Sequence, residues 1–415
     1  DRSPSRGLGD VYKRQKLYYK DKSVYTKIYN ERFNNEFSYH LPFEISGNKA
    51  FFIIDYQISR KIEEIYYISR QLDDILNQLP PIAFKYYINK NLIDEIMLTN
   101  DIEGVYSTRK EISQIIEMPD NSTKKVRLMG LVKKYQKLIN GEKIPLSSCN
   151  DLRLLFDEIV LNEIEEDEKP DGEIFRTGSV SVCTATDKEK HRGLYPEKKL
   201  IDFLNKSLDF LTNENNVGPL VKIAVFHYLF GYAHPFYNGN GRTSRFISSY
   251  LLCNILNQSI ALRISYTIKN DKNKYYKAFD ICNDPKNKGD ITPFIYSFID
   301  IIKNAAKSSL ENLESLKQRL EYYSTIHENI YNFFENDLQS KIVYILIQNA
   351  LFSRKGVFIE ELKHHLECSE ATIRKNIKSL IKHGLIITTE REKNKMLYEL
   401  SLDDFEQFAE NIQQL

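Results

Sequence analysis

The feature that most constrains this 415-residue chain is a loop with two glycines between two apolar helical stretches. Residues 220–232 are apolar at helical spacing, and residues 243–256 resume the same period. Between them lies His234-Pro-Phe-Tyr-Asn-Gly-Asn-Gly-Arg-Thr-Ser-Arg245. Because two buried helices would fix both ends of this loop, we expect the chain to build a rigid site around it.

The second half of this loop has the features of a phosphate site. Gly239 and Gly241 tolerate positive φ, so the N–H groups of Gly239, Asn240 and Gly241 can turn inward around an anion. The loop also begins a helix, whose N-terminus attracts the same anion. Arg242 and Arg245 are three residues apart and share a helix face, where each guanidinium can hold a phosphate with two hydrogen bonds.

His234 and Asn238 add the groups that a transfer reaction needs. A neutral imidazole is well suited to take a proton from an attacking hydroxyl near pH 7. Asn238 offers a hard oxygen of the kind that magnesium accepts beside phosphate oxygens. The plainer alternative is a glycine-rich turn at a helix start with a capping histidine and surface arginines. All these residues occur within one short loop, and this favours a site.

The loop resembles the Fic family signature, His-Pro-Phe-x-(Asp/Asn)-Gly-Asn-Gly-Arg-x-x-Arg, at every specified position. Fic proteins are mostly adenylyltransferases with a helical-bundle fold, and they move AMP from ATP onto a hydroxyl side chain of a target protein. Gly241 argues against the subgroup that has lysine at this position and uses the site for other phosphoryl chemistry. The resemblance implies a general base, His234; a magnesium ligand, Asn238; an anion hole, Gly239, Asn240 and Gly241; a phosphate contact, Arg242; and a γ-phosphate contact, Arg245.

A helix expected over about residues 84–104 ends in Thr99-Asn-Asp-Ile-Glu-Gly104. This segment resembles the (Ser/Thr)-x-x-x-Glu-(Gly/Asn) inhibitory motif of Fic proteins, and it lies N-terminal to the core as in the family's second inhibitory class. The resemblance implies that Thr99, Glu103 and Gly104 are inhibitory. Glu103 would pair with Arg245 and occupy the guanidinium that receives the γ-phosphate. The alternative is an ordinary helix end with Gly104 as the first residue beyond it.

Residues 172–182 change to a period of two, which predicts a strand, and residues 183–195 complete a small hairpin. The continuation His191-x-Gly-Leu-x-Pro-Glu resembles the Fic flap. A flap edge can hold a target segment by strand addition. The alternative is a hairpin with a purely structural role. The residues implied at the docking edge are Val180, Ser181 and Val182.

A tyrosine and an asparagine after the signature match the spacing of the pair that lines the adenosine pocket in Fic proteins. They are Tyr276 and Asn283. Residues 284–288 resemble an insertion directly after Asn283, which affects where its side chain points. Tyr276 as a plain core aromatic is the alternative.

The C-terminal part changes character at about residue 338. Three expected helices followed by two short strands resemble a winged helix-turn-helix domain. Its basic residues would contact DNA phosphates. The same fold also serves as a dimerisation or protein-docking module, so DNA and a second copy of the chain both stay open as partners. The basic residues are Arg374, Lys375, Lys378, Lys382, Arg391, Lys393 and Lys395.

Composition excludes several other classes of protein. The formal net charge is only +1, so no global field recruits nucleic acid or a membrane. The five cysteines lack Cys-x-x-Cys spacing and are expected to be reduced. The sequence shows neither a signal peptide nor an apolar run of about 18 residues, so we expect a cytoplasmic protein. Many Lys, Asn, Ile and Tyr residues without Trp are typical of an A/T-rich bacterial genome.

We therefore expect a mainly α protein, with a Fic-type helical bundle and a small β-hairpin flap followed by a winged helix-turn-helix domain. Within the N-terminal region we expect extended pieces over residues 23–29 and a break at Pro42, and within the core a solvated acidic loop over residues 163–168. The expected divisions are a disordered, non-native tail (1–15), an N-terminal helical region (16–140), the Fic core (141–300), a connector helix (301–337) and the winged helix with a C-terminal helix (338–415).

The leading hypothesis is an autoinhibited protein adenylyltransferase that uses ATP and Mg²⁺ and modifies a Ser, Thr or Tyr hydroxyl of a target protein. One alternative is a DNA-binding regulator whose Fic core only senses nucleotide. Another keeps the enzyme but reverses its task, so that Glu103 aligns a water molecule that removes AMP from a target. The two alternatives differ in their chemistry: the DNA-binding regulator neither forms nor breaks a covalent bond to AMP, whereas the reversed enzyme breaks one.

Overall fold

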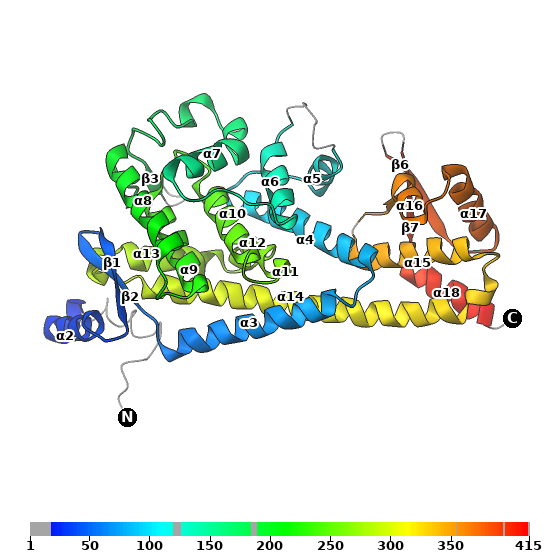
Figure 1. The fold of residues 1–415 in the computed structure, drawn as a ribbon, viewed down its shortest axis with the longest axis horizontal. Helices are drawn as coiled ribbons and strands as arrows, with labels where there is room; N and C mark the ends of the chain where they lie inside the picture. The colour runs from blue at the N-terminus through cyan, green and yellow to red at the C-terminus, as the bar shows by residue number, and fades with distance from the viewer. Residues whose placement is uncertain (1–17, 119–125, 184–188, 354, 393–394, 414–415) are drawn as a thin grey trace. The chain divides into compact units, whose positions relative to one another are not determined.

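The computed structural model describes residues 18–118, 126–183, 189–353, 355–392 and 395–413. It is mainly helical (Figure 1), as expected. Two compact units are present, the first formed by residues 1–70 with 93–307 and the second by residues 71–92 with 308–415. The expected tail over residues 1–15 lies outside the described residues. All the site residues predicted from the sequence belong to the first unit.

The elements of the first unit run in chain order from a short helix and a hairpin to the bundle around the loop. Helices α3, α4 and α14 each contribute residues to both units. The elements are α2 (Lys22–Phe33), β1 (Ser38–Ile45), β2 (Asn48–Ile53), α3 (Tyr56–Leu76), α4 (Pro81–Ile102), α5 (Arg109–Ile116), α6 (Met129–Ile139), α7 (Cys149–Ile159), the 3₁₀ turns η1 (Leu161–Glu163) and η2 (Glu166–Glu168), β3 (Ser181–Cys183), β4 (Glu189–Arg192), α8 (Glu197–Asn213), α9 (Pro219–Ala233), α10 (Asn240–Cys253), α11 (Gln258–Ala261), α12 (Ile264–Asn270), α13 (Lys272–Asn283), η3 (Pro285–Asn287) and α14 (Thr292–Asn329).

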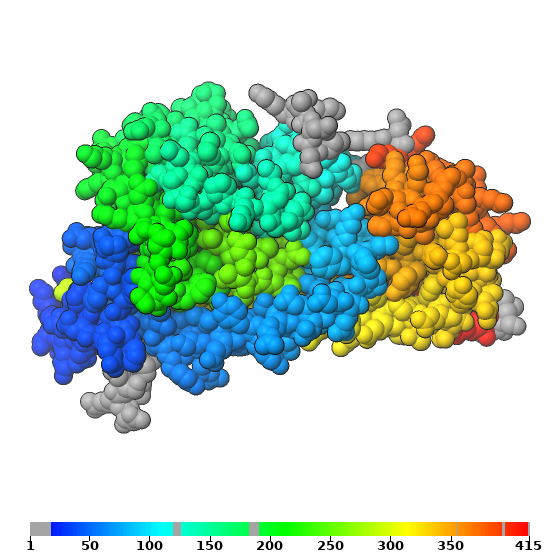
Figure 2. All heavy atoms as spheres, in the orientation of Figure 1, coloured from blue at the N-terminus to red at the C-terminus, as the bar shows by residue number. Residues whose placement is uncertain are grey.

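The N-terminal region differs from the expectation, because residues 23–29 are helical and a hairpin follows them. Asp21 caps α2 by accepting hydrogen bonds from two N–H groups of its first turn, and this cap outweighs the β preference of the tyrosines. Pro42 does not break the chain but lies within β1, at the point where the pairing with β2 is irregular. Aromatic residues of β1 pack on α8, where the blue and green surfaces adjoin in Figure 2.

The core of the first unit centres on α9, which is buried on nearly every side and packs against both α8 and α10. Helix α9 ends before His234, whose left-handed backbone (φ 51°, ψ 62°) turns the chain sharply. Gly239 has φ 75°, which costs glycine no Cβ clash, and α10 begins at the next residue. The loop predicted from the sequence is therefore present between two buried helices.

The flap hairpin is present but shorter than expected. Among the described residues of the hairpin, 181–183 pair with 189–192, and the strand predicted over residues 172–182 is wrong up to residue 180. In this segment two side-chain carboxylates accept the backbone N–H groups that a neighbouring strand would otherwise bind. Glu197 accepts from the N–H groups of residues 173–175, and Asp171 accepts from the N–H of Thr177. An alternating pattern therefore does not produce a strand here.

The second unit contains the expected helices together with one strand that the sequence analysis missed. Strand β5 pairs with β7 in a three-stranded sheet of order β5-β7-β6. The connector expected over residues 301–337 is not a separate element, because α14 starts at Thr292 within the core and continues to Asn329. The further elements are η4 (Tyr331–Phe333), α15 (Asp337–Phe352), β5 (Val357–Phe358), α16 (Ile359–Leu366), α17 (Glu370–Lys382), β6 (Ile387–Glu392), β7 (Lys395–Leu400) and α18 (Leu402–Gln413).

The basic residues expected to meet DNA are only partly available on this unit. Arg374 forms an ion pair with Glu370, and Lys395 lies 3.7 Å from Glu360. Lys393 lies outside the described residues. The winged helix-turn-helix and its DNA contact stay predictions, which a salt-dependent gel shift would test. In the described part of the chain, no helix has the length and apolar character that crossing a bilayer requires.

Candidate active site

The N-terminus of α10 forms the centre of the site. Thr243 is the first residue of this helix whose N–H bonds back, to the carbonyl of Gly239, so the N–H groups of Asn240, Gly241 and Arg242 are the free first-turn donors. The N–H of Gly239 is taken by the Oδ1 atom of Asn238 at 2.6 Å. The N–H groups left open for an anion therefore begin one residue later than the sequence predicted.

The side chain of Asn240 stabilises the loop from within. Its amide oxygen accepts from the N–H of Phe236 at 3.0 Å, and its amide nitrogen donates to the carbonyl of the same residue at 2.7 Å. The Phe236 ring stacks on Phe156 of α7, with ring centroids 3.7 Å apart. These contacts fix the path of the chain between His234 and α10.

His234 begins the loop that leads into α10. Burial is the main cause that lowers the pKa of its imidazole to about 4, and the neighbouring charges of His191 and Arg176 contribute to the same shift. The ring also hydrogen-bonds the carbonyl of Gly231, so in the neutral form one nitrogen donates and the other is left as an acceptor. A neutral ring with one free acceptor is the form that a general base requires.

Arg176 connects the flap to the His234 loop. Its side chain is fully buried. The guanidinium donates to the carbonyls of His234 at 2.9 Å and Leu194 at 3.0 Å, and also to the carbonyl of Gly178. The position of His234 is thereby tied to both ends of the hairpin.

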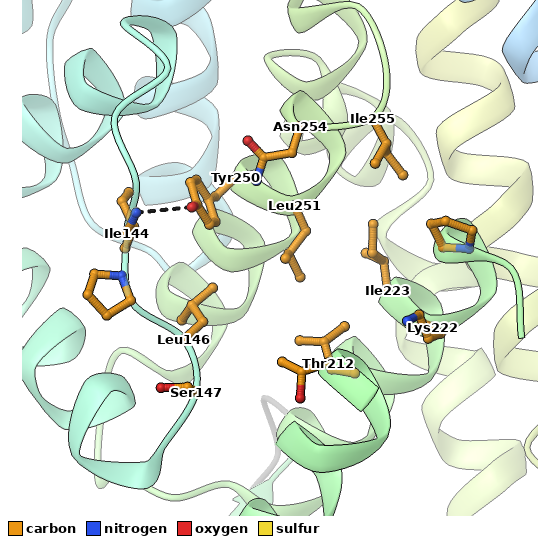
Figure 3. Close-up of a pocket in the computed structure, with 13 residues that line it drawn as sticks. Ile144, Leu146, Ser147, Thr212, Lys222, Ile223, Tyr250, Leu251, Asn254 and Ile255 are labelled. Carbon is orange, nitrogen blue, oxygen red and sulfur yellow. Dashed lines mark hydrogen bonds between the residues drawn. The ribbon is translucent and has the colours of Figure 1, made fainter. Parts of the chain in front are cut away.

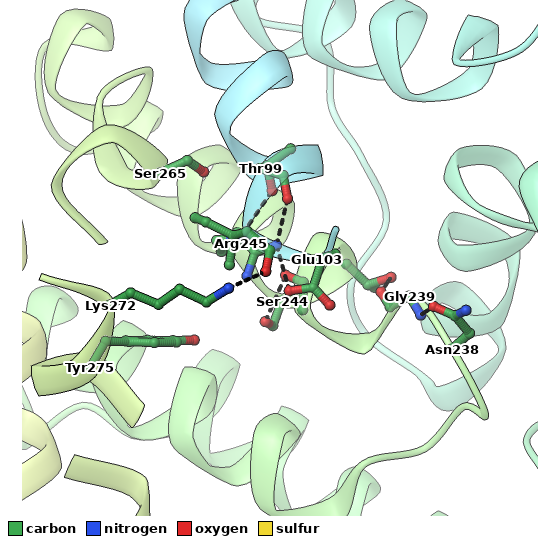
Figure 4. A network of polar contacts seen from close by, with 12 residues as sticks. Thr99, Glu103, Asn238, Gly239, Ser244, Arg245, Ser265, Lys272 and Tyr275 are labelled. Carbon is green, nitrogen blue, oxygen red and sulfur yellow. Dashed lines mark hydrogen bonds and ion pairs between the residues drawn. The ribbon is translucent and has the colours of Figure 1, made fainter. Parts of the chain in front are cut away.

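The guanidinium of Arg245 is held by the end of α4. It donates to the hydroxyl of Thr99 at 2.8 Å, to the carbonyl of Thr99 at 2.9 Å and to a carboxylate oxygen of Glu103 at 2.9 Å (Figure 4). Arg245 is 1% exposed, whereas Glu103 remains 22% exposed. The residues predicted as an inhibitory motif therefore occupy Arg245 in this structure.

Glu103 also reaches the first turn of α10. A Cβ atom at position 241 would overlap with its carboxylate, so only glycine leaves room for Glu103 here. The carboxylate thus lies where an anion bound to the first-turn N–H groups would lie. Gly104 follows with φ 76° and ends the helix as predicted.

The polar face of α4 has a further member that sequence reasoning missed. Glu95 lies one turn before Thr99 and accepts from the N–H and the hydroxyl of Ser265, at 2.9 and 2.6 Å. Burial raises the pKa of Glu95 to about 7. Lys272 donates to the carbonyl of Ile102 at 2.7 Å and holds the last turn (Figure 4). Glu95, Thr99 and Glu103 are spaced by four residues, and this spacing could have indicated that they lie on one face of the helix.

The acidic run predicted to be a solvated loop is exposed over residues 165–167, but Glu163 and Glu168 belong to the site. Glu163 is nearly buried and forms an ion pair of 2.6 Å with Arg242, which is 1% exposed. Burial raises the pKa of Glu163, and the charge of Arg242 opposes that rise. The guanidinium expected to contact phosphate is therefore already paired, and its Nε atom is buried without a partner among the described residues.

Asn238, the predicted magnesium ligand, contacts the same acidic run. Its amide nitrogen lies 3.0 Å from each carboxylate oxygen of Glu168. Its amide oxygen faces the N–H of Gly239. The site therefore offers two kinds of hard oxygen, an amide and a carboxylate, and this donor set fits a magnesium ion.

Tyr276 and Asn283 lie seven residues apart on α13, but only one of them is close to Arg245. Burial raises the pKa of Tyr276, and the charge of Glu103 adds to the rise, so the ring lies near the inhibitory contact. Asn283 instead accepts from the hydroxyl of Tyr228 at 2.8 Å. Both adenosine roles stay predictions.

A separate pocket of about 450 Å³ contains none of the predicted site residues (Figure 3). Its lining is mostly apolar, and the hydroxyl of Tyr250 accepts from the N–H of Ile144 at its edge. The chemistry therefore has to be sought at the α9–α10 loop.

Comparison with known proteins points to the same loop as the functional site. The model of the Fic/DOC family matches residues 149–252, which include α7, the flap and the whole loop. This chain contains a Fic domain. A solved structure of a Fic family protein from Desulfovibrio desulfuricans G20 aligns with 88% of this chain and 99% of that one, at 19% sequence identity and a TM-score of 0.51, which shows a shared fold.

Two curated relatives match part of the Fic domain. Protein adenylyltransferase Fic of Drosophila yakuba is 29% identical over 108 residues, which are 26% of this chain and 20% of that protein. The protein of the same name from Drosophila willistoni is 29% identical over 114 residues, 27% of this chain and 21% of that one. The chain thus matches about a fifth of the length of these relatives. The family match ends before Tyr276 and begins after Glu103, so neither residue is part of it.

Proposed function

We propose that the chain is an autoinhibited protein adenylyltransferase that transfers AMP from ATP to a hydroxyl side chain of a target protein. The observation that carries this proposal is the position of Glu103, whose carboxylate lies on Arg245 and against the first turn of α10. Both contacts are ones that a triphosphate would make. The adenylyltransferase names of the two partial relatives support the same chemistry.

In the proposed reaction, the free nitrogen of His234 takes the proton of the target hydroxyl as the hydroxyl oxygen attacks the α-phosphorus of ATP. The new oxygen–phosphorus bond forms as the bond to the β-phosphate oxygen breaks, and pyrophosphate leaves. The first-turn N–H groups of α10 stabilise negative charge on the phosphates. The hydroxyl would be presented by a target segment added beside β3, at the edge that includes Val180, Ser181 and Val182.

Magnesium is the metal that usually accompanies ATP in such a site. Asn238 would hold it through the amide oxygen, and the bound ion would neutralise charge on the phosphates and on the leaving pyrophosphate. The side chains of the chain itself perform the other steps. His234 moves the proton, α10 binds the phosphates, and Arg245 binds the γ-phosphate once Glu103 has left it.

The pH dependence of transfer tests the state of His234. Because its pKa is lowered to about 4, the base form persists as pH falls and is lost only as pH approaches 4. A histidine with an ordinary pKa would lose half of its base form at about pH 6.5. We expect kcat/KM of the Glu103→Gly variant to change less than about twofold between pH 7.5 and 5.5. A fall of about tenfold over this range would contradict the assignment.

Label transfer tests the proposed function directly. The Glu103→Gly variant, with magnesium and ATP labelled at the α-phosphate, should label proteins of a cell lysate. ATP labelled at the γ-phosphate should give no label under the same conditions, because pyrophosphate leaves. Label from the γ-position would indicate a kinase instead, and no label from either position would contradict the proposal.

Removal of AMP is a second candidate function, and the partial exposure of Glu103 favours it. One carboxylate oxygen bonds Arg245, whereas the side chain as a whole keeps 22% of its surface exposed next to the loop. Such a carboxylate can orient a water molecule toward a bound phosphodiester. Incubation of an AMP-modified protein with the wild-type chain and with Glu103→Gly separates the two functions, since only removal would be lost in the variant.

A further inference from the structure

An acidic side chain lies against the residue proposed to hold magnesium. Glu168 is the last residue of η2, between α7 and the flap, and both of its carboxylate oxygens lie 3.0 Å from the amide nitrogen of Asn238. Within the part of the chain that the structure describes, no lysine, arginine or histidine forms an ion pair with this carboxylate. A hydrogen bond from a neutral amide leaves the charge of Glu168 uncompensated.

The amide of Asn238 is oriented at both ends. Its nitrogen faces Glu168, and its oxygen accepts from the N–H of Gly239 at the start of α10. An amide oxygen has two lone pairs, so one remains for a ligand. The charge of Glu168 and the free lone pair of Asn238 are thereby placed in one small region.

Three acidic residues of the run, Glu165, Asp167 and Glu168, form no ion pair among the described residues, and of these three Glu168 is the one that contacts Asn238. Glu163 is compensated by Arg242, and Glu166 forms an ion pair with Lys169. Magnesium sites at nucleotides generally use one or two protein carboxylates together with phosphate oxygens. Asn238 is neutral and cannot meet that requirement, whereas Glu168 can.

We propose that Glu168 is the anionic residue of the divalent-cation site and that its carboxylate supplies the charge that Asn238 lacks. This inference rests on the proposed function, because the cation is the one bound with the nucleotide. The competing explanation is that Glu168 only orients the amide of Asn238. A glutamine at position 168 separates the two, since its side-chain oxygen can still accept from Asn238 but carries no charge.

Manganese binding in the presence of saturating ADP tests the proposal on the full chain. ADP lacks the γ-phosphate that competes with Glu103 for Arg245, and Glu103 is the same in every variant compared, so a difference in Mn²⁺ binding between them does not come from the inhibitory contact. Electron paramagnetic resonance counts free Mn²⁺ directly. We expect Glu168→Gln to weaken Mn²⁺ binding about fivefold. The double variant Asn238→Asp with Glu168→Gln should return to within about twofold of the wild type, because the charge is restored in the same site.

The matched control is Glu166→Gln, which removes the same charge from the same run at an exposed position and should bind Mn²⁺ like the wild type. Several results would overturn the proposal: no ADP-dependent Mn²⁺ binding, unchanged binding in Glu168→Gln, a loss no larger than in the control, or a loss that the added Asn238→Asp substitution does not restore. Because the readout needs no AMP transfer, a failure of the proposed function leaves the Mn²⁺ result interpretable by itself.

Discussion

Replacement of His234 by alanine is expected to lower kcat/KM for AMP transfer by at least about a hundredfold, the low end of what a general base contributes. The imidazole acts on the target hydroxyl and not on the nucleotide, so the loss should appear in transfer alone. The measurement is best made with Glu103→Gly as the parent, where the rate is expected to be high enough to follow over two orders of magnitude.

ADP binding is the internal control for this variant. Alanine at position 234 leaves the first-turn N–H groups of α10 in place, so calorimetric titration with ADP should give an affinity within about twofold of the parent. An unaltered transfer rate in His234→Ala would show that another group takes the proton. A simultaneous loss of ADP binding would show that the loop, and not the base, had been damaged.

Replacement of Glu103 by glycine is expected to raise AMP transfer, including modification of the chain's own tyrosine or threonine residues, by at least about tenfold. A tenfold change in the productive fraction corresponds to about 1.4 kcal/mol. One hydrogen bond to a charged group contributes about 1.5–3 kcal/mol, so losing the contact of Glu103 with Arg245 suffices. Mass spectrometry for an added AMP, with magnesium and ATP, measures the difference.

Two comparisons make the result specific. The variant should gain affinity for ATP but little for ADP, because only the γ-phosphate competes with Glu103 for Arg245. Asp101→Asn removes a negative charge two residues earlier without loosening the backbone, where the side chain pairs with Lys269, and should leave transfer unchanged. Equal modification in wild type and Glu103→Gly would mean that residues 99–104 are only a helix end.

Arg245→Ala separates the two roles of the arginine. The single variant loses the γ-phosphate contact and the partner of Glu103 together, so its low activity alone is ambiguous. In combination with Glu103→Gly the inhibitory contact is absent, and we expect the double variant to stay at least about tenfold below Glu103→Gly. An active double variant would contradict the phosphate role of Arg245.

The helices around the loop could be predicted because their signals are local. Apolar spacing marks α9 and α10, and the glycines between them require the backbone that the structure shows at Gly239. The segment from Thr99 to Gly104 also ends a helix as its residues indicate. In each case the residues that decide the conformation lie within a few positions of each other.

The partners of Arg242 and Asn238 could not be predicted in this way. Glu163 and Glu168 precede them by 79 and 70 residues, and the pairing exists only because α7 and η2 fold back over the loop. By composition alone an acidic run indicates exposure to solvent. Two residues of the run nevertheless belong to the site, because Glu163 neutralises the buried guanidinium of Arg242 and Glu168 bonds the amide of Asn238.

Local patterns were misleading where side chains supplied the hydrogen bonds. Residues 172–180 alternate like a strand, yet Asp171 and Glu197 accept their N–H groups and no strand partner is needed. In the same way Asp21 caps a helix over residues that favour extended structure. A period of two or a run of tyrosines indicates a preference, and one well-placed carboxylate reverses it.

The attachment of α4 determines how fast the inhibitory contact can come and go. Thr99 is bonded to Arg245 through its hydroxyl and its carbonyl, whereas the residues after it form the final turn, which Lys272 holds from outside and which ends at Gly104. Release of Glu103 therefore requires unwinding of one helix end, which takes on the order of a microsecond, far less than one catalytic cycle of about a millisecond or longer. Wild-type progress curves should consequently be slow but linear from the first turnover, because inhibition is a rapid equilibrium whose free energy sets the basal rate.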